Sequence, residues 1–366
     1  MADAPLEADI RRLIALAGPM PVSEFMGLCL GHPQHGYYIT HDPIGASGDF
    51  TTSPEISQMF GELVGLWAAA VWRRLGAPGN VRLIELGPGR GTMMADILRA
   101  ANVMREFRQA VAVHLVETSP TLIARQKQVL GNPNVSITWH ASLADIPDGP
   151  AIIVANEFFD ALPVNQAVKQ ADGWHERVIG IDGKGNLAFG LAPDPMKFFD
   201  QTLPPQVRMA EVGSIYEWRS DAQALEVGRR VVRGGGGAAL LVDYGHLDGM
   251  VGDTFQALRG QRKADPLIAP GFADVTAHVD FQALGSAAES IGARVHGPLD
   301  QATFLRRLGI EQRAVNLKAV APPDKAKAVD VALGRLTAGG PTGMGTMFKV
   351  MGLSAPEIAA LPGFDP

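Results

Sequence analysis

The chain has 366 residues with 19% charged and 46% hydrophobic side chains, an ordinary composition for a globular protein that can form one large domain or two. Its formal net charge of −6 argues against general nucleic-acid binding. The single cysteine, Cys29, excludes an internal disulfide and a cysteine-rich metal site, and we expect a cytoplasmic protein because neither a targeting segment nor an apolar run of membrane-spanning length is present.

Residues 1–80 are expected to form an N-terminal helical segment that includes a covering loop. Apolar residues at helical spacing predict helices over residues 6–18 and 21–33. A stretch rich in Gly, Pro, Thr and Ser follows, and "SPEISQMFGELVGLWAAAVWRRLG" then predicts one long helix that Ser53 caps ahead of Pro54.

Residues 81–350 alternate between apolar runs and amphipathic helices. Continuous apolar runs favour strands that are covered on both faces, and helices between them favour a parallel sheet. We therefore predict an α/β fold with a doubly wound, mostly parallel, seven-stranded sheet, built from the runs VRLIEL (81–86), VAVHLVE (111–117), VSITWH (135–140), AIIVAN (151–156), AALLVDYG (238–245), ARVHGPL (293–299) and MGTMFKVMGL (344–353).

Two segments interrupt this alternation. Residues 163–200 alternate like a β-hairpin that turns at Asp182-Gly183, and residues 300–340 are mostly helical. We interpret both as insertions into one domain over residues 81–350, followed by a C-terminal tail over 351–366.

A glycine loop follows the first predicted strand. The run "IELGPGRGTMMADILR" places Gly87, Gly89 and Gly91 between a strand and a helix, which is typical of nucleotide binding. A phosphate-binding P-loop requires a lysine after the last glycine, and Thr92 stands there instead. The Gly-x-Gly-x-Gly spacing also departs from the dinucleotide fingerprint, but this departure alone leaves a dinucleotide open.

Acidic residues at the strand ends narrow the choice of ligand. A carboxylate at Glu85 would repel a pyrophosphate and attract a cation, and S-adenosylmethionine carries an ammonium and a sulfonium but no phosphate. Glu117 ends the second strand, where it can accept hydrogen bonds from ribose hydroxyls, as it would for NAD. Ser142 and Leu143 follow the third strand and are the expected adenine contacts, with Asp145 as a second candidate.

Seven motifs in order carry a resemblance to a known family. "GDFTTSPEIS", "IELGPGRGTMMADILR", "LVETSP", "NEFFDALPV", "LLVDYG", "GDTFQA" and "VTAHVDF" resemble the MidA-like S-adenosylmethionine-dependent methyltransferases from about Pro21 to Val350. The resemblance implies a class I methyltransferase (Rossmann-like) fold. Through the mitochondrial members, it also implies symmetric dimethylation of an arginine on the 49 kDa subunit of respiratory complex I, in support of complex assembly. The expected partner is the bacterial counterpart of that subunit.

The loop after the fourth strand is the expected place for the methyl acceptor. An arginine acceptor is cationic and needs carboxylates to orient it. "NEFFDALPVNQ" offers Asn156 beside the cofactor and Glu157 and Asp160 as candidate catalytic carboxylates. Glu157 matches the first glutamate of a loop in known arginine methyltransferases. That loop's second glutamate has no counterpart near Gln166, so an amide or amine acceptor is also compatible with the sequence.

Further candidates lie at the ends of other elements. Asp243 ends the fifth strand and is a second possible partner of a guanidinium, and His278 in "TAHVD" resembles the histidine of a Thr-His-Trp loop in arginine methyltransferases. Asp49 and Phe50 are expected to cross over the cofactor. The nine histidines show no metal-ligand spacing, so we expect no metal.

Two other functions remain compatible with the sequence. The insertions over 163–200 and 300–340 could form a surface that holds an unfinished subunit, which would make the chain an assembly scaffold. Alternatively, the chain could methylate a small molecule. The sequence alone leaves the oligomeric state open.

Overall fold

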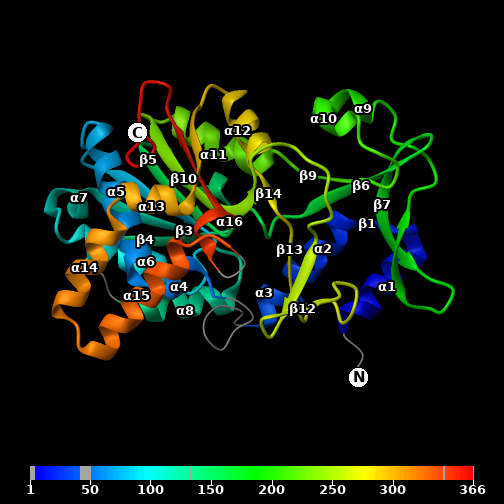
Figure 1. The fold of residues 1–366 in the computed structure, drawn as a ribbon, viewed down its shortest axis with the longest axis horizontal. Coiled ribbons are helices and arrows are strands. Elements are labelled where there is room, and N and C mark those ends of the chain that lie inside the picture. The colour runs from blue at the N-terminus through cyan, green and yellow to red at the C-terminus, as the bar shows by residue number, and fades with distance from the viewer. Residues whose placement is uncertain (1–4, 42–50, 132–133, 341–342, 366) are drawn as a thin grey trace. The chain divides into compact units, whose positions relative to one another are not determined.

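The computed structural model describes residues 5–41, 51–131, 134–340 and 343–365. The chain divides into two units, each assembled from three stretches (Figure 1). Unit 1 comprises Met1–Phe50, Asp160–Ser220 and His246–Gln282, and unit 2 comprises Thr51–Phe159, Asp221–Gly245 and Ala283–Pro366. Residues of the expected N-terminal segment are therefore found in both units.

Unit 2 contains a sheet built from the predicted apolar runs. A continuous path through it follows the order β15-β16-β10-β5-β2-β3-β4. The strands on this path are β2 (Val81–Leu86), β3 (Val111–Val116), β4 (Ile137–His140), β5 (Ala151–Asn156), β10 (Gly237–His246), β15 (Arg294–Asp300) and β16 (Phe348–Ser354).

The strand directions correct part of the predicted topology. Strands β10, β5, β2, β3 and β4 pair in parallel, whereas β16 pairs antiparallel with both β10 and β15. The sheet is mixed, and the two-residue strand β14 (Val279–Asp280), which pairs with β10 off this path, gives it eight described strands, so the prediction of seven strands was wrong. A short additional strand cannot be recognised from an apolar run, because few residues contribute to the pattern.

Helices of unit 2 cover the sheet and complete a large apolar core. Helices α5 and α6 pack together, and Phe60, Val64 and Met93 of these helices meet Val154 and Leu240 of the sheet in this core. The helices are α4 (Ser53–Ile56), α5 (Gln58–Arg74), α6 (Thr92–Ala101), α7 (Arg105–Ala110), α8 (Pro120–Leu130), the 3₁₀ turn η1 (Leu143–Asp145), α11 (Ala222–Val232), α12 (Phe281–Glu289, most of which belongs here), α13 (Gln301–Arg307), α14 (Ile310–Val320), α15 (Pro323–Thr337) and α16 (Met344–Met347).

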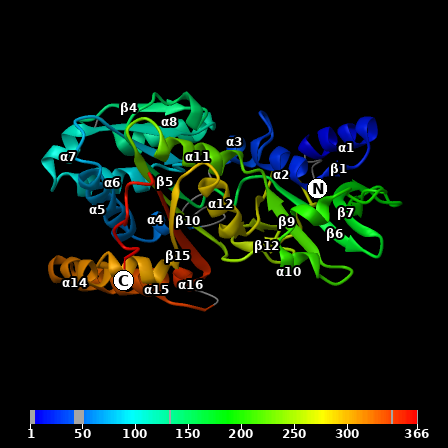
Figure 2. The ribbon, with the colours of Figure 1, turned by 90° about the horizontal axis from the view of Figure 1, so that it is seen from above.

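The helix predicted from residue 53 onward is broken. Ser53 begins the short helix α4, and Ser57, whose backbone is extended, separates α4 from α5. The Ser57 side chain accepts a hydrogen bond from the backbone N–H of Met59, so Ser57 and not Ser53 caps the long helix. The predicted helical block is confirmed, because α13, α14 and α15 contact one another, and α14 and α15 lie side by side in both views (Figures 1 and 2).

Unit 1 contains two smaller sheets. The larger has five strands, with β1-β7-β6-β9 in order and β8 beside β7, and the smaller has the order β12-β11-β13. Strands β7 and β8 form the predicted hairpin, in which the backbone N–H of Asp182 donates to the carbonyl of Asn186. The strands of unit 1 are β1 (Met20–Pro21), β6 (Val164–Gln170), β7 (Gly173–Ile181), β8 (Leu187–Leu191), β9 (Ile215–Arg219), β11 (Gln256–Arg259), β12 (Arg262–Ala264), β13 (Asp274–Thr276) and β14 (Val279–Asp280).

The helices of unit 1 are α1 (Pro5–Ala17), α2 (Val22–Gly31), α3 (Tyr37–Thr40), α9 (Phe199–Thr202) and α10 (Pro205–Arg208). Apolar residues of α1 and α2, such as Leu6, Ile10 and Phe25, are fully buried and share a core with Val164 of β6 and Ile179 of β7. Within the described ranges of the chain, no helix is long and apolar enough to cross a membrane.

Candidate functional site

The glycine loop of unit 2 has the backbone that its sequence predicts. Gly87, Gly89 and Gly91 have φ angles of 61°, 53° and 84°, in the left-handed region that favours glycine. Helix α6 begins directly after Gly91. A Cβ atom added at Gly87 would lie 2.9 Å from Cδ2 of Phe158, so a side chain there would also displace the Phe158 ring.

Glu85 is the last residue but one of β2, and its carboxyl group lies inside the protein. The residue is 2% exposed, and burial raises the pKa of its carboxyl to about 8. Its Oε2 atom has no hydrogen-bond partner in the part of the chain that the structure describes. A buried acceptor in this state favours a ligand that brings a hydrogen-bond donor or a positive charge.

Asn156 ends β5, the parallel neighbour of β2, at the same edge of the sheet. Its Nδ2 donates to Oε1 of Glu157 at 3.0 Å. Its Oδ1 is buried and accepts no hydrogen bond from the described residues. Glu85 and Asn156 thus bring two unsatisfied oxygen acceptors to the carboxyl ends of adjacent parallel strands, where such sheets bind ligands.

Glu117 directly follows β3 and is connected to the glycine loop through Gln126 of α8. Oε1 of Glu117 accepts from the backbone N–H groups of Thr118 and Ser119, both at 2.8 Å. Gln126 Nε2 donates to Oε2 of Glu117 at 3.2 Å and to the carbonyl of Gly89 at 2.8 Å. Burial raises the pKa of Glu117, although these hydrogen bonds act against that rise.

Sequence reasoning missed Gln126, which is fully buried. Its Oε1 accepts from Nε1 of Trp139 at 2.8 Å, so both ends of the amide are bonded. In the sequence, Gln126 stands four positions after Leu122, on the apolar side of the helix that follows Glu117. A polar residue on that side was the one sign that pointed to it.

These residues fit S-adenosylmethionine. The unsatisfied Glu85 oxygen suits the ammonium group of the ligand, and Glu117 is the acidic residue at the second strand end that a ribose requires. The left-handed glycines let the backbone approach the ligand closely. No phosphate is needed to satisfy any of these groups.

Residues expected beside adenine form a small capping structure. Ser142 accepts from the backbone N–H of Ala144 at 3.2 Å, and Asp145 accepts from the backbone N–H of Ser142 at 3.0 Å. Both side chains are exposed, whereas Leu143 is 2% exposed. The polar side chains thus stabilise η1, and Leu143 supplies buried apolar surface.

Glu157 occupies a strained position in the loop after β5. Its φ angle is 51°, which is uncommon for a residue other than glycine. Its Oε1 accepts from the backbone N–H of Ser53 at 3.1 Å as well as from Asn156. The carboxylate therefore connects this loop to α4.

Asp243 supports the same loop from the end of β10. It is 1% exposed, and its two oxygens accept from the backbone N–H groups of Phe159 and Tyr244, both at 3.0 Å. Asp243 and Glu157 thus hold the loop from two sides.

The other two candidate catalytic residues belong to unit 1. Asp160 is 5% exposed, and its backbone carbonyl accepts from the N–H of Ala277 at 3.2 Å, so the segment of His278 lies beside it. Burial, helped by the nearby positive charges of His246 and Arg219, lowers the pKa of His278. The imidazole is therefore neutral at neutral pH.

A second buried carboxylate near Asp160 was not predicted. Asp274 is 4% exposed and accepts from the hydroxyl of Tyr38 at 2.9 Å. Burial holds the pKa of Tyr38 well above its usual range, and the negative charges of Asp274 and Asp160 raise it further. The negative charges of both carboxylates therefore disfavour ionisation of the same Tyr38 hydroxyl.

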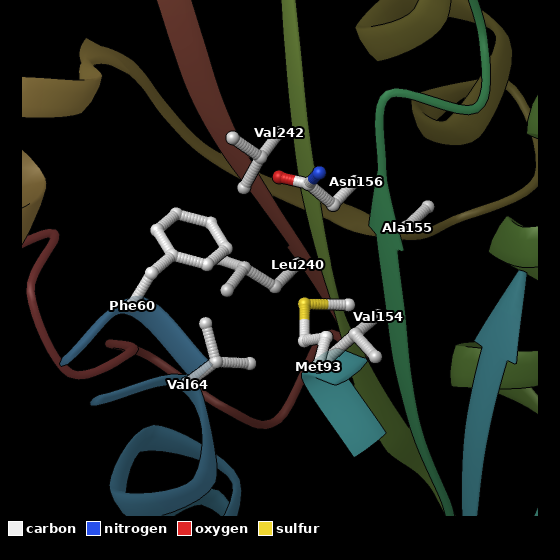
Figure 3. A pocket seen from close by; sticks show the side chains of 8 residues that line it. All are labelled: Phe60, Val64, Met93, Val154, Ala155, Asn156, Leu240 and Val242. Carbon is white, nitrogen blue, oxygen red and sulfur yellow. The ribbon is translucent and has the colours of Figure 1, made fainter. Parts of the chain in front are cut away.

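The structure adds little on the residues expected to cover the cofactor and on metal binding. Asp49 and Phe50 lie outside the described residues. Behind Asn156, side chains of α5, α6 and the sheet, such as Phe60 and Met93, pack so closely that they leave no space for a water molecule (Figure 3). This apolar region therefore does not hold the cofactor. In the described segments no group of three metal-ligating side chains comes together.

Comparison with known proteins identifies relatives of the chain. A family model described as "Putative S-adenosyl-L-methionine-dependent methyltransferase" matches residues 63–299. A crystal structure of a Burkholderia thailandensis protein, bound to S-adenosyl-homocysteine, superposes with a TM-score of 0.84 at 29% identity over 98% of this chain and 94% of that chain.

Curated relatives share more sequence. The mitochondrial protein arginine methyltransferase NDUFAF7 of Homo sapiens is 39% identical over 85% of this chain and 76% of its own length. The Drosophila melanogaster homologue is 37% identical over 97% of this chain and 86% of its own length. The similarity therefore extends across both units.

Proposed function

Because the chain belongs to a family of S-adenosyl-L-methionine-dependent methyltransferases, we propose that it methylates an arginine side chain of a protein. The curated relatives named above are protein arginine methyltransferases. The observation in this chain that favours a cationic acceptor is the pair of buried carboxylates, Asp160 and Asp274, whose negative charges both raise the pKa of Tyr38. A guanidinium is cationic and has five N–H donors, so two carboxylates in the same unit offer it acceptors of opposite charge.

The cofactor side of the proposal uses residues of unit 2. Glu85 binds the ammonium group, Glu117 the ribose hydroxyls, and Gly87, Gly89 and Gly91 line the cofactor with backbone, with Asn156 beside them. When bound, S-adenosylmethionine supplies the methyl group, whose bond to sulfur breaks as its bond to the acceptor nitrogen forms. Leu143 provides the apolar contact to adenine, and Asp49 and Phe50 keep their proposed place over the cofactor.

The four candidate catalytic residues have different roles in this proposal. Glu157 and Asp243 shape the loop after β5 through their hydrogen bonds to backbone N–H groups. Asp160, together with Asp274, orients the acceptor guanidinium. The acceptor nitrogen loses one proton as it is methylated, and the neutral imidazole of His278 accepts it.

The most specific part of the proposal is the identity of the acceptor protein. The resemblance described from the sequence favours an arginine of the bacterial counterpart of the 49 kDa subunit of respiratory complex I, dimethylated symmetrically during assembly. The single cysteine fits action in a reducing compartment, such as the cytoplasm.

A labelling experiment tests the proposal. The purified protein is incubated with methyl-tritiated S-adenosylmethionine and lysate of a strain that lacks its gene. The control is Gly89→Val, since a branched side chain is strained at a φ of 53°. We expect label on one protein band, absent in the control, and a methylated arginine by mass spectrometry. Label confined to small molecules, or on another residue type, would refute the arginine proposal. If no label transfers while the cofactor binds, a scaffold function is favoured.

A further inference from the structure

Strand β9 of unit 1 presents two different faces. Because side chains alternate along a strand, Tyr216 and Trp218 lie on one face and Glu217 and Arg219 on the other. The ring of Trp218 packs 4.8 Å from that of Phe199, and Tyr216 belongs to the same aromatic cluster, so this face anchors the strand. The opposite face carries two charged side chains toward loops that contain proposed catalytic residues.

Arg219 donates to four backbone carbonyls on two segments of the chain. On the first segment, Nη2 donates to Asp160 at 3.3 Å and Nε to Leu162 at 3.1 Å. On the second, Nη2 donates to Ala277 and Nη1 to His278, both at 2.6 Å. One planar guanidinium thus joins the backbone of Asp160 to that of His278.

Glu217 holds a third segment, which includes Thr254 of the "GDTFQA" motif. Its Oε1 accepts from the backbone N–H groups of Thr254 and Phe255, at 3.1 and 3.2 Å, and from Nε2 of Gln166 at 2.5 Å. Its Oε2 accepts from the hydroxyl of Thr254, and the same hydroxyl oxygen accepts from the backbone N–H of His278 at 2.9 Å. Glu217 therefore reaches the His278 segment through Thr254.

We propose that Glu217 and Arg219 are positioning residues for methyl transfer, which fix the segments of Asp160 and His278 relative to each other. This inference rests on the proposed function, because it takes Asp160 and His278 as the groups that act on the acceptor. Arginine is required at position 219, since only its rigid fork of donors reaches four carbonyls at once, whereas a lysine ammonium has three donors on a flexible stem. Small misplacements of catalytic groups are costly to the rate.

The experiment compares Arg219→Lys with Arg208→Lys. Arg208 is a matched control, because it also donates to two backbone carbonyls in unit 1, those of Leu203 and Gln201, away from the proposed catalytic residues. We measure the initial rate of label transfer at saturating cofactor, the Kd for S-adenosylhomocysteine, and amide hydrogen exchange. We expect Arg219→Lys to lower the rate about 10- to 100-fold with the Kd changed less than about twofold, and Arg208→Lys to leave both unchanged.

A role in stability alone gives a different pattern. In that case the rate of Arg219→Lys would fall only in proportion to the folded fraction, and the Kd would weaken with it, which would overturn the proposal. In a His278→Ala background, Arg219→Lys should add less than about a twofold further loss, because coupled residues are not additive. Full additivity would also count against the proposal.

The outcome can be separated from failure of the proposed function. If the wild-type protein labels a small molecule instead of a protein, the same rate comparison is made with that acceptor. If it transfers no label, amide hydrogen exchange tests whether Arg219 fixes the His278 segment. Faster exchange at Ala277 and His278 in Arg219→Lys, but not in Arg208→Lys, supports positioning, and unchanged exchange overturns it.

Discussion

The carboxylate of Glu157 accepts a hydrogen bond from the backbone N–H of Ser53, 3.1 Å away, so the loop after β5 is tied to the first residue of α4. The same oxygen accepts from the side chain of Asn156. A carboxylate that is held by two donors of its own chain supports a loop more directly than it grips a substrate.

We therefore expect Glu157→Gln and Glu157→Ala to differ. The amide oxygen of glutamine can still accept from Ser53, so the rate of methyl transfer should fall by less than about fivefold. Alanine leaves the Ser53 N–H and the Asn156 amide without this acceptor, which costs about 1–3 kcal/mol and should lower the rate by about tenfold or more. Steady-state labelling and thermal melting measure both effects. A loss of more than about 100-fold in Glu157→Gln would instead assign the negative charge to the acceptor.

Glu85 predicts a dependence of cofactor binding on pH. Its pKa is about 8 in the ligand-free protein, and a bound ammonium group stabilises the charged carboxylate. Binding below pH 8 should therefore release a proton from Glu85. Calorimetry at pH 7 in buffers with different ionisation enthalpies measures the release, and Glu85→Gln should release about one proton fewer and bind more weakly. Equal proton release by both proteins would contradict this role.

The same residue predicts the pH dependence of stability without ligand. The folded-state pKa is raised above the ordinary value of 4.5, so the folded protein holds a proton that the unfolded chain loses between pH 4.5 and about 8. Stability contributed by the neutral carboxyl is present below pH 4.5 and is lost as the pH rises to about 8. Relative to wild type, Glu85→Gln should consequently gain melting temperature from pH 5 to pH 8.5. A constant difference between the two proteins would refute the assignment.

Gln126 allows a test of the connection between the ribose acid and the glycine loop. Gln126→Ala removes the bonds to Glu117, to the Gly89 carbonyl and to Trp139, and it leaves a buried space. We expect a loss of about 2–4 kcal/mol in the free energy of unfolding and weaker cofactor binding. Denaturant unfolding and calorimetry measure these. Gln128→Ala, at an exposed position of the same helix, is the control and should change neither.

The sequence predicted those features that depend on neighbours along the chain. The glycine loop, Glu85 and Glu117 follow from a strand and the turn after it, and the hairpin at Asp182 from local alternation. The N-cap was misplaced by four residues, because both Ser53 and Ser57 are good capping residues and only the extended backbone at Ser57 decides between them.

Features that depend on distant residues could not be predicted from a single sequence. Asp274 becomes significant because Tyr38, which is 236 positions away, donates to it. Arg219 reads as an ordinary strand residue until its contacts with Asp160 and His278 are known. The reversed direction of β16 likewise depends on the path of the chain through the preceding helices, which hydrophobic patterns do not encode.

Asp274 gives the sharpest test of the acceptor proposal. Asp274→Asn keeps the size of the side chain and an oxygen that accepts from Tyr38, but it removes one of the two negative charges proposed to hold the guanidinium. Loss of a charge-assisted hydrogen bond costs about 1.5–3 kcal/mol, so transfer to an arginine-containing protein should fall by about 10- to 100-fold at subsaturating acceptor. Tyr38→Phe is the matched control. It removes the Tyr38–Asp274 hydrogen bond, which Asp274→Asn retains, but it keeps both carboxylates, so it should lower transfer much less. The Kd for S-adenosylhomocysteine should be unchanged in both variants. If Asp274→Asn lowers transfer no more than Tyr38→Phe does, the negative charge of Asp274 does not act on the acceptor, and the cation-site proposal is refuted.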